Sequence, residues 1–205
     1  SNAYIFYGPE YLGKKETALR FIAKIIGTYS SETDAYSKIA DNNYPDYLQI
    51  EPTYISKGKL INQSEINNDK KQTTKASIRI EQIRNIKVFL SRKSIQAPKK
   101  FILIQDSHLL NESSSNCLLK TLEEPTNGVF ILLTSSLNLL LDTIISRCQL
   151  IRFKPYSYQE LKQILNQSQN ITKDLLSGSD VLENLIFISN GSPGKLVDNL
   201  KMWNE

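Results

Sequence analysis

Two stretches of the sequence carry residues whose types and spacing suit chemistry on phosphate groups. Gly8, Gly13 and Lys14 lie between a short apolar run and a helical pattern, which is the order of strand, glycine-rich loop and helix in a phosphate-binding loop. The backbone N–H groups of such a loop surround phosphate oxygens, and the helix N-terminus adds positive potential. Arg147 follows a second strand pattern, and its guanidinium is a permanently charged fork of donors that suits phosphate.

The phosphate-loop pattern is incomplete at one position. Lys15 stands where the pattern requires Ser or Thr, whose hydroxyl holds the Mg²⁺ that bridges the terminal phosphates. Thr17 cannot replace that hydroxyl, because two residues further along a helix is a rotation of roughly 200°. A tight strand-to-helix turn without a ligand therefore remains an alternative to a nucleotide site.

A third candidate residue ends another apolar run. Residues 100–106 read KFILIQD, which predicts a buried strand with Asp106 at the carboxyl edge of a parallel sheet, where ligands bind. A core strand that ends in an exposed aspartate is the alternative. His108, the single histidine of the chain, is expected in a loop and not as a metal ligand.

The elements around these residues alternate between strand and helix as far as Phe153. We expect strands at 4–7, 44–52, 100–106 and 129–134, with helices near 14–26, 78–90 and 112–124. The polar segment 54–77 predicts a long loop or a weakly paired hairpin. The fold class is therefore α/β, with a parallel-sheet, P-loop-type core over residues 1–154.

After Phe153 the pattern is helical throughout. Ser157 with Glu160, and Asp180 with Glu183, have the spacing of capping boxes, and a last helix is expected from Pro193 to about Trp203. We place a domain boundary at Pro155, so that residues 155–205 form a small all-helical lid domain.

Composition excludes several classes of protein. The chain has 205 residues with 40% hydrophobic content, enough for one large domain or one with a small second domain. No apolar run approaches the ~18 residues of a membrane span. Two cysteines and one histidine cannot build a tetrahedral zinc site, so we expect neither zinc nor another metal. The cysteines fit a reducing cytoplasm, and a net charge of +4 permits DNA contact without arguing for it.

The most specific pattern lies in residues 112–153. The motifs NCLLKTLEEP, FILLTS and IISRCQ follow one another in this order, and together they resemble the AAA+ clamp-loader subunits of bacterial DNA polymerase III, most of all those of the delta-prime type. The resemblance extends over nearly the whole chain. It implies an AAA+ core with a helical lid, and a role in ATP-driven loading of the sliding clamp onto primed DNA. The implied partners are the gamma/tau and delta subunits in a hetero-oligomeric ring, the sliding clamp and primer-template DNA.

The resemblance also assigns the site residues. Active relatives have the Mg²⁺-binding hydroxyl that Lys15 replaces, an acidic residue after Asp106, and an arginine where this chain has Gly194. The joint loss implies a subunit that does not hydrolyse ATP itself, with Gly8, Gly13, Lys14 and Asp106 as a degenerate site that either holds ATP or ADP or stays vacant. Arg147 is then the catalytic residue, acting in trans as an arginine finger on the ATP of a neighbouring subunit. A salt bridge to Glu123 or Glu124 is the alternative for Arg147.

Two alternative functions are also compatible with the sequence. One alternative is an active ATPase subunit of the gamma/tau type, and another is a nucleic-acid-binding scaffold that uses the lysines of segment 54–77. Ser1, Asn2 and Ala3 are typical of tag cleavage and are excluded from the predicted fold. Relatives also have a helical segment before the first strand and a C-terminal helical collar, and we expect both to be absent from this chain.

Overall fold

The computed structural model describes residues 2–27, 31–56, 59–62, 75–124, 127–167 and 179–203. The part of the chain outside these ranges includes Pro125, which follows the helix predicted near 112–124, and most of segment 54–77. The side chains of Asp180 and Trp203 are also outside the described part. The chain divides into two compact units: Ser1–Tyr7 with Lys15–Arg152, and Gly8–Lys14 with Phe153–Glu205. The chain passes into the second unit at Phe153, and the glycine loop belongs to that unit as well.

A five-stranded parallel sheet forms the centre of the first unit, as the alternating pattern predicted. Its strands run in the order β2-β5-β6-β1-β7. Ile5 of β1 lies opposite Leu132 of β6 and Leu150 of β7. Every residue of β5 and β6 is buried, because these strands are interior to the sheet and covered on both faces. The strands are β1 (Ala3–Tyr7), β2 (Tyr47–Ile50), β5 (Lys100–Ile104), β6 (Gly128–Thr134) and β7 (Gln149–Arg152).

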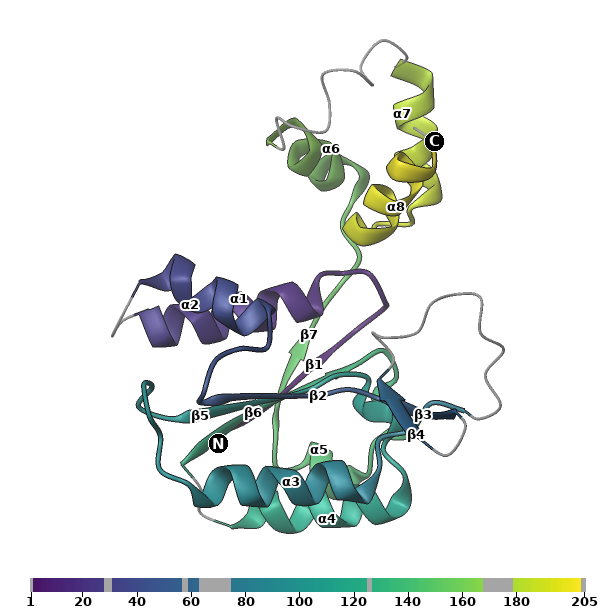
Figure 1. Cartoon of the computed structure of the whole chain (residues 1–205). Coiled ribbons are helices and arrows are strands. Elements are labelled where there is room, and N and C mark those ends of the chain that lie inside the picture. Colours follow the sequence, from purple (N-terminus) through teal and green to yellow (C-terminus); the bar gives the residue numbers. More distant parts are fainter. Residues whose placement is uncertain are drawn as a thin grey trace. The chain divides into compact units, whose positions relative to one another are not determined.

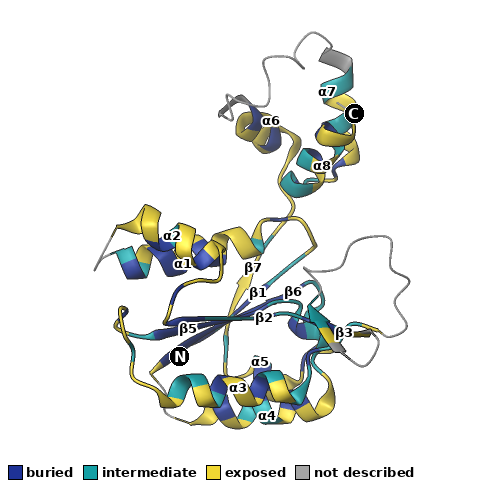
Figure 2. Ribbon diagram, viewed as in Figure 1, coloured by how far each residue is buried: buried dark blue, intermediate teal, exposed yellow. Residues whose placement is uncertain are grey.

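Helices cover both faces of this sheet (Figure 1). On one face lie α1 (Lys14–Gly27) and α2 (Glu32–Ala40), and on the other lie α3 (Ile80–Ser91) and α4 (Glu112–Glu123), with the short α5 (Asp142–Ile145) beside α4. Each of the helices α1 to α4 has a buried side and an exposed side, as Figure 2 shows. The core contains Ile83, Ile86 and Leu118 from α3 and α4, each with no exposed surface.

One prediction about the N-terminal part of the chain is wrong in detail. Ala3, which we excluded from the fold, is the first residue of β1, pairs with Phe130 and is 5% exposed. The strand therefore begins one residue earlier than predicted, because alanine gives no strand signal of its own and its burial depends on the sheet. In α1, Phe21 is 37% exposed and packs with its ring edge-to-face on Tyr4 at 5.9 Å.

The described part of segment 54–77 includes an antiparallel hairpin, one of the two alternatives that we expected there. Its strands are β3 (Thr53–Ser56) and β4 (Lys59–Asn62). Thr53 also exchanges two backbone hydrogen bonds with Ser77, at 3.0 and 3.1 Å, which closes the base of the segment. Residues 57–58 and 63–74 lie outside the described residues.

The second unit consists of helices α6 (Tyr158–Gln167), α7 (Ser179–Ile188) and α8 (Pro193–Trp203), together with the loop Gly8–Lys14. Five buried side chains form its small core: Leu161, Leu165, Ile186, Leu196 and Leu200. The capping box before α6 is confirmed, since Ser157 N donates to Glu160 Oε2 at 2.7 Å and Glu160 N donates to Ser157 Oγ at 3.3 Å. The capping box predicted at Asp180 depends on a side chain that lies outside the described part of the chain, where α7 begins at Ser179.

Among the described residues, no helix combines the length and the apolar character needed to cross a membrane.

Candidate functional site

The glycine loop is packed within the second unit by the chain that leads into α6. Gly8 has φ of +146°, and a Cβ atom added there would lie 2.2 Å from the carbonyl oxygen of Phe153. Gly13 has φ of +77°, with no heavy atom within 4 Å of a Cβ added there. Both positions require the conformational freedom of glycine, but only Gly8 is in close contact with another segment.

The lysine of the loop contacts the loop's own backbone. Lys14 Nζ donates to the carbonyl oxygens of Gly8 at 2.7 Å and Pro9 at 2.5 Å. In a nucleotide-bound phosphate loop this ammonium group contacts the terminal phosphates instead. A bound nucleotide would therefore compete with two existing hydrogen bonds.

The next two carbonyl groups of the loop face the start of α8. Gly194 N donates to Tyr11 O at 3.0 Å, and Ser192 Oγ approaches Glu10 O at 3.5 Å. A Cβ atom on Gly194 would lie 3.0 Å from both the Cβ and the carbonyl oxygen of Tyr11, and Lys195 Nζ lies 5.9 Å from the centre of the Tyr11 ring. The arginine that active relatives have at the position of Gly194 would therefore press on Tyr11.

Asp106 lies in the first unit, just beyond the carboxyl end of β5, in the left-handed conformation with φ of 45°. The residues after it form a short 3₁₀ helix, in which Ser107 is fully buried and donates to Leu133 O at 3.0 Å. His108 Nδ1 lies 3.4 Å from Thr134 Oγ1 at the end of β6. Asp106 thus occupies the sheet edge that the sequence predicted, followed by a hydroxyl and an imidazole in place of a carboxylate.

Arg147 lies in the turn between α5 and β7, where it is held from two sides. Its Nη1 donates to Thr143 O in α5 at 2.9 Å, and its Nη2 donates to Glu123 Oε1 at the end of α4 at 2.6 Å. The side chains of Arg147 and Glu123 are 40% and 47% exposed. Of the two alternatives for the salt bridge, Glu123 is the partner, whereas Glu124 pairs with Lys87 at 2.8 Å.

Exposure decides how firmly the Arg147–Glu123 ion pair holds the guanidinium. An exposed pair contributes only about 0–1 kcal/mol, because water solvates both charges when they separate. A buried pair would resist separation, since an unpaired buried charge is strongly unfavourable. The exposed ion pair therefore orients the guanidinium of Arg147 without locking it in place.

Cys148, next to Arg147, has the properties of a packing residue. Burial raises the pKa of its thiol from 9.0 to about 11. The thiol is therefore protonated at neutral pH, whereas a nucleophilic cysteine needs a lowered pKa. A thiol with such a raised pKa is poorly suited to act as a nucleophile.

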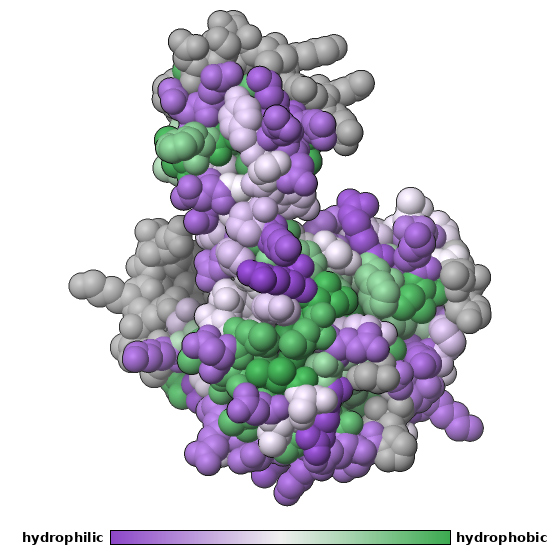
Figure 3. All heavy atoms as spheres, turned by 180° about the vertical axis from the view of Figure 1, so that it is seen from behind, coloured by the Kyte–Doolittle hydropathy of each residue, from purple (hydrophilic) through white to green (hydrophobic). Residues whose placement is uncertain are grey.

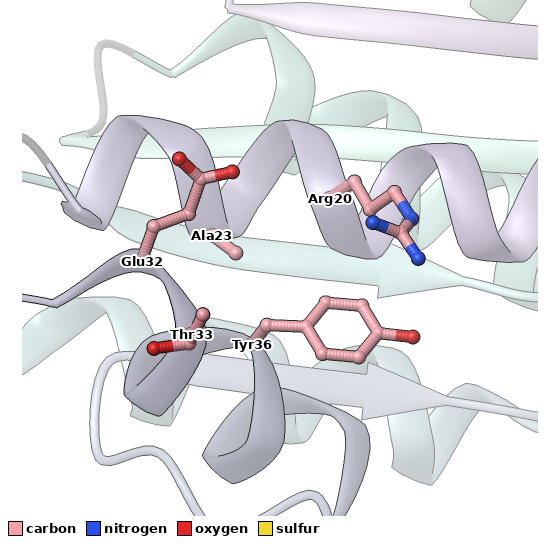
Figure 4. A pocket seen from close by; sticks show the side chains of 5 residues that line it. All are labelled: Arg20, Ala23, Glu32, Thr33 and Tyr36. Atoms are coloured by element: carbon pink, nitrogen blue, oxygen red, sulfur yellow. The ribbon is translucent and has the colours of Figure 1, made fainter.

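A hollow of about 400 Å³ lies between α1 and α2, away from all the residues considered so far (Figure 4). Arg20 and Tyr36 lie in its wall, and both bind Glu16, the first through an ion pair at 2.6 Å and the second through a hydrogen bond at 2.7 Å. That hydrogen bond is the main reason why the pKa of Tyr36 is raised. Arg20 and Tyr36 are thus both engaged with Glu16, and Ala23, Glu32 and Thr33 complete the lining of the hollow.

The surface of the first unit also includes apolar side chains, as Figure 3 shows from behind. β7 is an edge strand, and all four of its residues are exposed, including Leu150 at 45% and Ile151 at 40%. The strand that follows Arg147 thus carries apolar side chains that are exposed. In the described ranges, no three His, Cys, Asp or Glu side chains are grouped so that they could hold a metal ion.

Sequence reasoning missed two residues that matter to the local structure. Asp46 is fully buried and accepts N–H groups from Ile95, Gln96 and Ala97, although its sequence context indicated only the approach to a strand. Tyr11 has φ of 61°, and its carbonyl group binds the start of α8. The second contact joins residues far apart in the chain, so no local pattern signals it.

Comparison with known proteins identifies what this arrangement is similar to. The family model described as "DNA polymerase III, delta subunit" matches residues 1–157. Similar curated proteins include DNA polymerase III subunit delta' of Pseudomonas aeruginosa, 27% identical over 94% of this chain and 54% of that protein. Subunit delta' of Bacillus subtilis is 29% identical over 76% of this chain and 43% of that protein. The chain thus spans about half the length of the curated relatives it matches.

Solved structures show the same fold at lower identity. A DNA polymerase III gamma subunit-related protein of Thermotoga maritima has a TM-score of 0.50 at 19% identity, over 93% of this chain and 55% of the other. The RuvB Holliday junction branch migration motor of Thermotoga maritima has a TM-score of 0.56 at 15% identity, over 97% of this chain and 53% of the other. These similarities support the α/β core with helical lid and no finer conclusion.

Proposed function

Since the chain belongs to the DNA polymerase III delta-subunit family, we propose that it serves as a clamp-loader subunit that presents Arg147 to ATP held by a neighbouring ATPase subunit. The position of Arg147 is the observation that carries the proposal. The residue lies in an exposed turn, and its guanidinium is oriented by two partners without being buried. An arginine finger that enters a neighbour's site must be accessible in this way.

The charge that such a finger meets explains its effect. In phosphoryl transfer, negative charge spreads over the oxygens of the transferred group, and an arginine finger stabilises that charge by a factor of about 10³–10⁵ in rate. Any weakening of the exposed ion pair with Glu123 on contact with phosphate costs at most about 1 kcal/mol. The expected gain exceeds this cost several-fold, so the ion pair does not oppose the proposed role.

The chain's own nucleotide site supports a non-hydrolytic subunit. Lys15 removes the Mg²⁺-binding hydroxyl, and no acidic residue follows Asp106 directly. Lys14 is engaged with the carbonyl groups of Gly8 and Pro9. ATP would then be hydrolysed only at the nucleotide sites of the neighbouring ATPase subunits.

The partners follow from the same premise. Gamma and tau subunits of DNA polymerase III are also similar to this chain, among them subunit gamma of Buchnera aphidicola, which is 28% identical over 98% of this chain. We propose a hetero-oligomeric ring with gamma/tau and delta subunits that loads the sliding clamp onto primer-template DNA. The chain then contributes structure and one arginine to the ring.

A reconstituted loader tests the proposal. The full-length protein carrying Arg147→Ala is assembled with its partner subunits, and ATP hydrolysis stimulated by DNA and clamp is measured against wild type. We expect a rate loss of at least about 10³-fold at the one affected site, with ATP binding by the partners unchanged. Arg20→Ala is the matched control, because Arg20 forms an ion pair of the same length, 2.6 Å, with Glu16 and lies in the wall of the α1–α2 hollow.

The measured rate of ATP hydrolysis also includes the other ATPase sites of the ring. Single-turnover measurement of the site next to this subunit isolates its contribution from those of the other ATPase sites. An Arg147→Ala loader that hydrolyses ATP at this site as fast as wild type would refute the proposal and leave Arg147 as a salt-bridge residue.

A second candidate function is an active ATPase subunit of the gamma/tau type. The observation that favours it is the retention of Gly8, Gly13 and Lys14 together with the similarity to gamma and tau subunits. Titration of a fluorescent ATP analogue with and without Mg²⁺ separates the two functions. Tight, Mg²⁺-dependent binding with turnover by this protein alone would favour the second candidate.

A further inference from the structure

We infer that Glu123 is a positioning residue for Arg147, which it keeps ordered while the guanidinium contacts the neighbour's ATP; this inference rests on the proposed function. The carboxylate stands at the last residue of α4, and its Oε1 accepts from Arg147 Nη2 at 2.6 Å. Thr143 O accepts from Nη1 of the same guanidinium at 2.9 Å. Two partners on different helices thus fix the plane of the guanidinium, which either partner alone would leave free to rotate.

The energetic reason is the flexibility of arginine. Its long side chain has high rotamer entropy in solution, which an interaction with phosphate must overcome if the side chain is not already ordered. Glu123 removes part of this entropy before the neighbour binds. Because the pair is 40% and 47% exposed, the carboxylate orders the guanidinium without holding it tightly.

Neighbouring residues show that this contact is specific to Glu123. Glu124, the next residue, binds Lys87 on α3 at 2.8 Å and makes no such contact with Arg147. Ser146 Oγ donates to Thr143 O at 3.1 Å, so the carbonyl group that orients Nη1 is itself fixed by the turn. The guanidinium, the end of α4 and the end of α5 therefore form one arrangement.

The test uses the reconstituted loader with full-length protein carrying Glu123→Ala, Glu123→Gln or Glu124→Ala. We expect Glu123→Ala to lower kcat at the neighbouring site about fivefold, equivalent to about 1 kcal/mol, with KM for ATP unchanged. Glu123→Gln should stay near wild type, because its amide oxygen can still accept from Nη2. Glu124→Ala should also stay near wild type, since it removes only a comparable exposed ion pair.

The outcomes separate this inference from the proposed function. If Arg147→Ala slows hydrolysis and Glu123→Ala does not, the inference is overturned and the finger stands. Equal losses of rate for Glu123→Ala and Glu124→Ala also overturn the inference, because Glu124 makes no hydrogen bond to Arg147. Equal losses for Glu123→Ala and Glu123→Gln overturn it as well, because the glutamine keeps an acceptor for Arg147 Nη2. If Arg147→Ala itself leaves the rate unchanged, the proposed function fails together with the inference.

Discussion

Asp46 supports the loop that leads into β5, and its replacement should destabilise the first unit severely. Its carboxylate is fully buried and accepts from three successive backbone N–H groups. The distances are 2.9 Å from Ile95 N to either oxygen, 2.6 Å from Gln96 N and 2.8 Å from Ala97 N. A single side chain therefore satisfies a stretch of backbone that belongs to no helix or strand.

The size of the effect follows from these contacts. A hydrogen bond to a charged group contributes about 1.5–3 kcal/mol, and a buried N–H group left without a partner costs about 1–3 kcal/mol. Ala97 is buried, whereas Ile95 and Gln96 are exposed, so water can replace the carboxylate at two of the three groups. We expect Asp46→Ala to lower the free energy of unfolding by about 3–5 kcal/mol. Asp46→Asn, which keeps one acceptor oxygen, should lower it by about 1–2 kcal/mol.

Equilibrium unfolding in urea, followed by circular dichroism, measures these differences. Amide hydrogen exchange at Gln96 and Ala97 reports the local change directly, because these amides lose protection first. Asp34→Ala serves as the control, since it removes only an exposed ion pair with Lys38 and should cost less than about 1 kcal/mol. An Asp46→Ala protein within 0.5 kcal/mol of wild type, roughly the effect of an ordinary surface substitution, would refute the reasoning.

Further predictions concern Gly8, Cys148 and Tyr36. Gly8→Ala should lower the melting temperature of the second unit sharply, because the added Cβ would lie 2.2 Å from Phe153 O. Gly13→Ala is the control, since it adds only backbone strain. Equal melting temperatures for the two variants would contradict this prediction. Cys148 should react with iodoacetamide slowly at pH 8 and faster as the pH approaches its pKa of about 11, and rapid alkylation of the folded protein at pH 8 would contradict the burial. Because this pKa is raised above 9.0, the contribution of Cys148 to stability is complete below pH 9 and is lost as the pH rises through about 11, which unfolding measured against pH would detect. Tyr36→Phe should leave loader activity unchanged while removing the hydrogen bond to Glu16, and a loss of activity would assign a function to the hollow.

The sequence predicted those features that depend on local pattern. The runs that form β5 and β6 are apolar throughout, so their interior position in a parallel sheet could be expected. The capping box at Ser157 and Glu160 uses only contacts within one turn, and it is present in the structure. Asp106 was placed at the sheet edge by the same local reasoning.

Features that depend on distant segments could not be predicted. The exposure of Leu150 and Ile151 follows from the edge position of β7, which their apolar character does not indicate. The choice of Glu123 over Glu124 as the partner of Arg147 depends on how α4 ends against α5. The contact of Tyr11 with Gly194 joins opposite ends of the chain, and only the assembled second unit contains it.

The inclusion of Gly8–Lys14 in the second unit affects how this protein can fold during synthesis. Glu10 and Ser192, which are in contact there, are separated by 182 positions in the sequence. The loop is synthesised long before its helical partner, so the second unit cannot be completed until the chain has been made as far as α8. Contacts of such long sequence separation are slow to form. A lid expressed from Phe153 onward would lack one of its own segments, and separating the two units requires an engineered connection that carries the loop along with the helices.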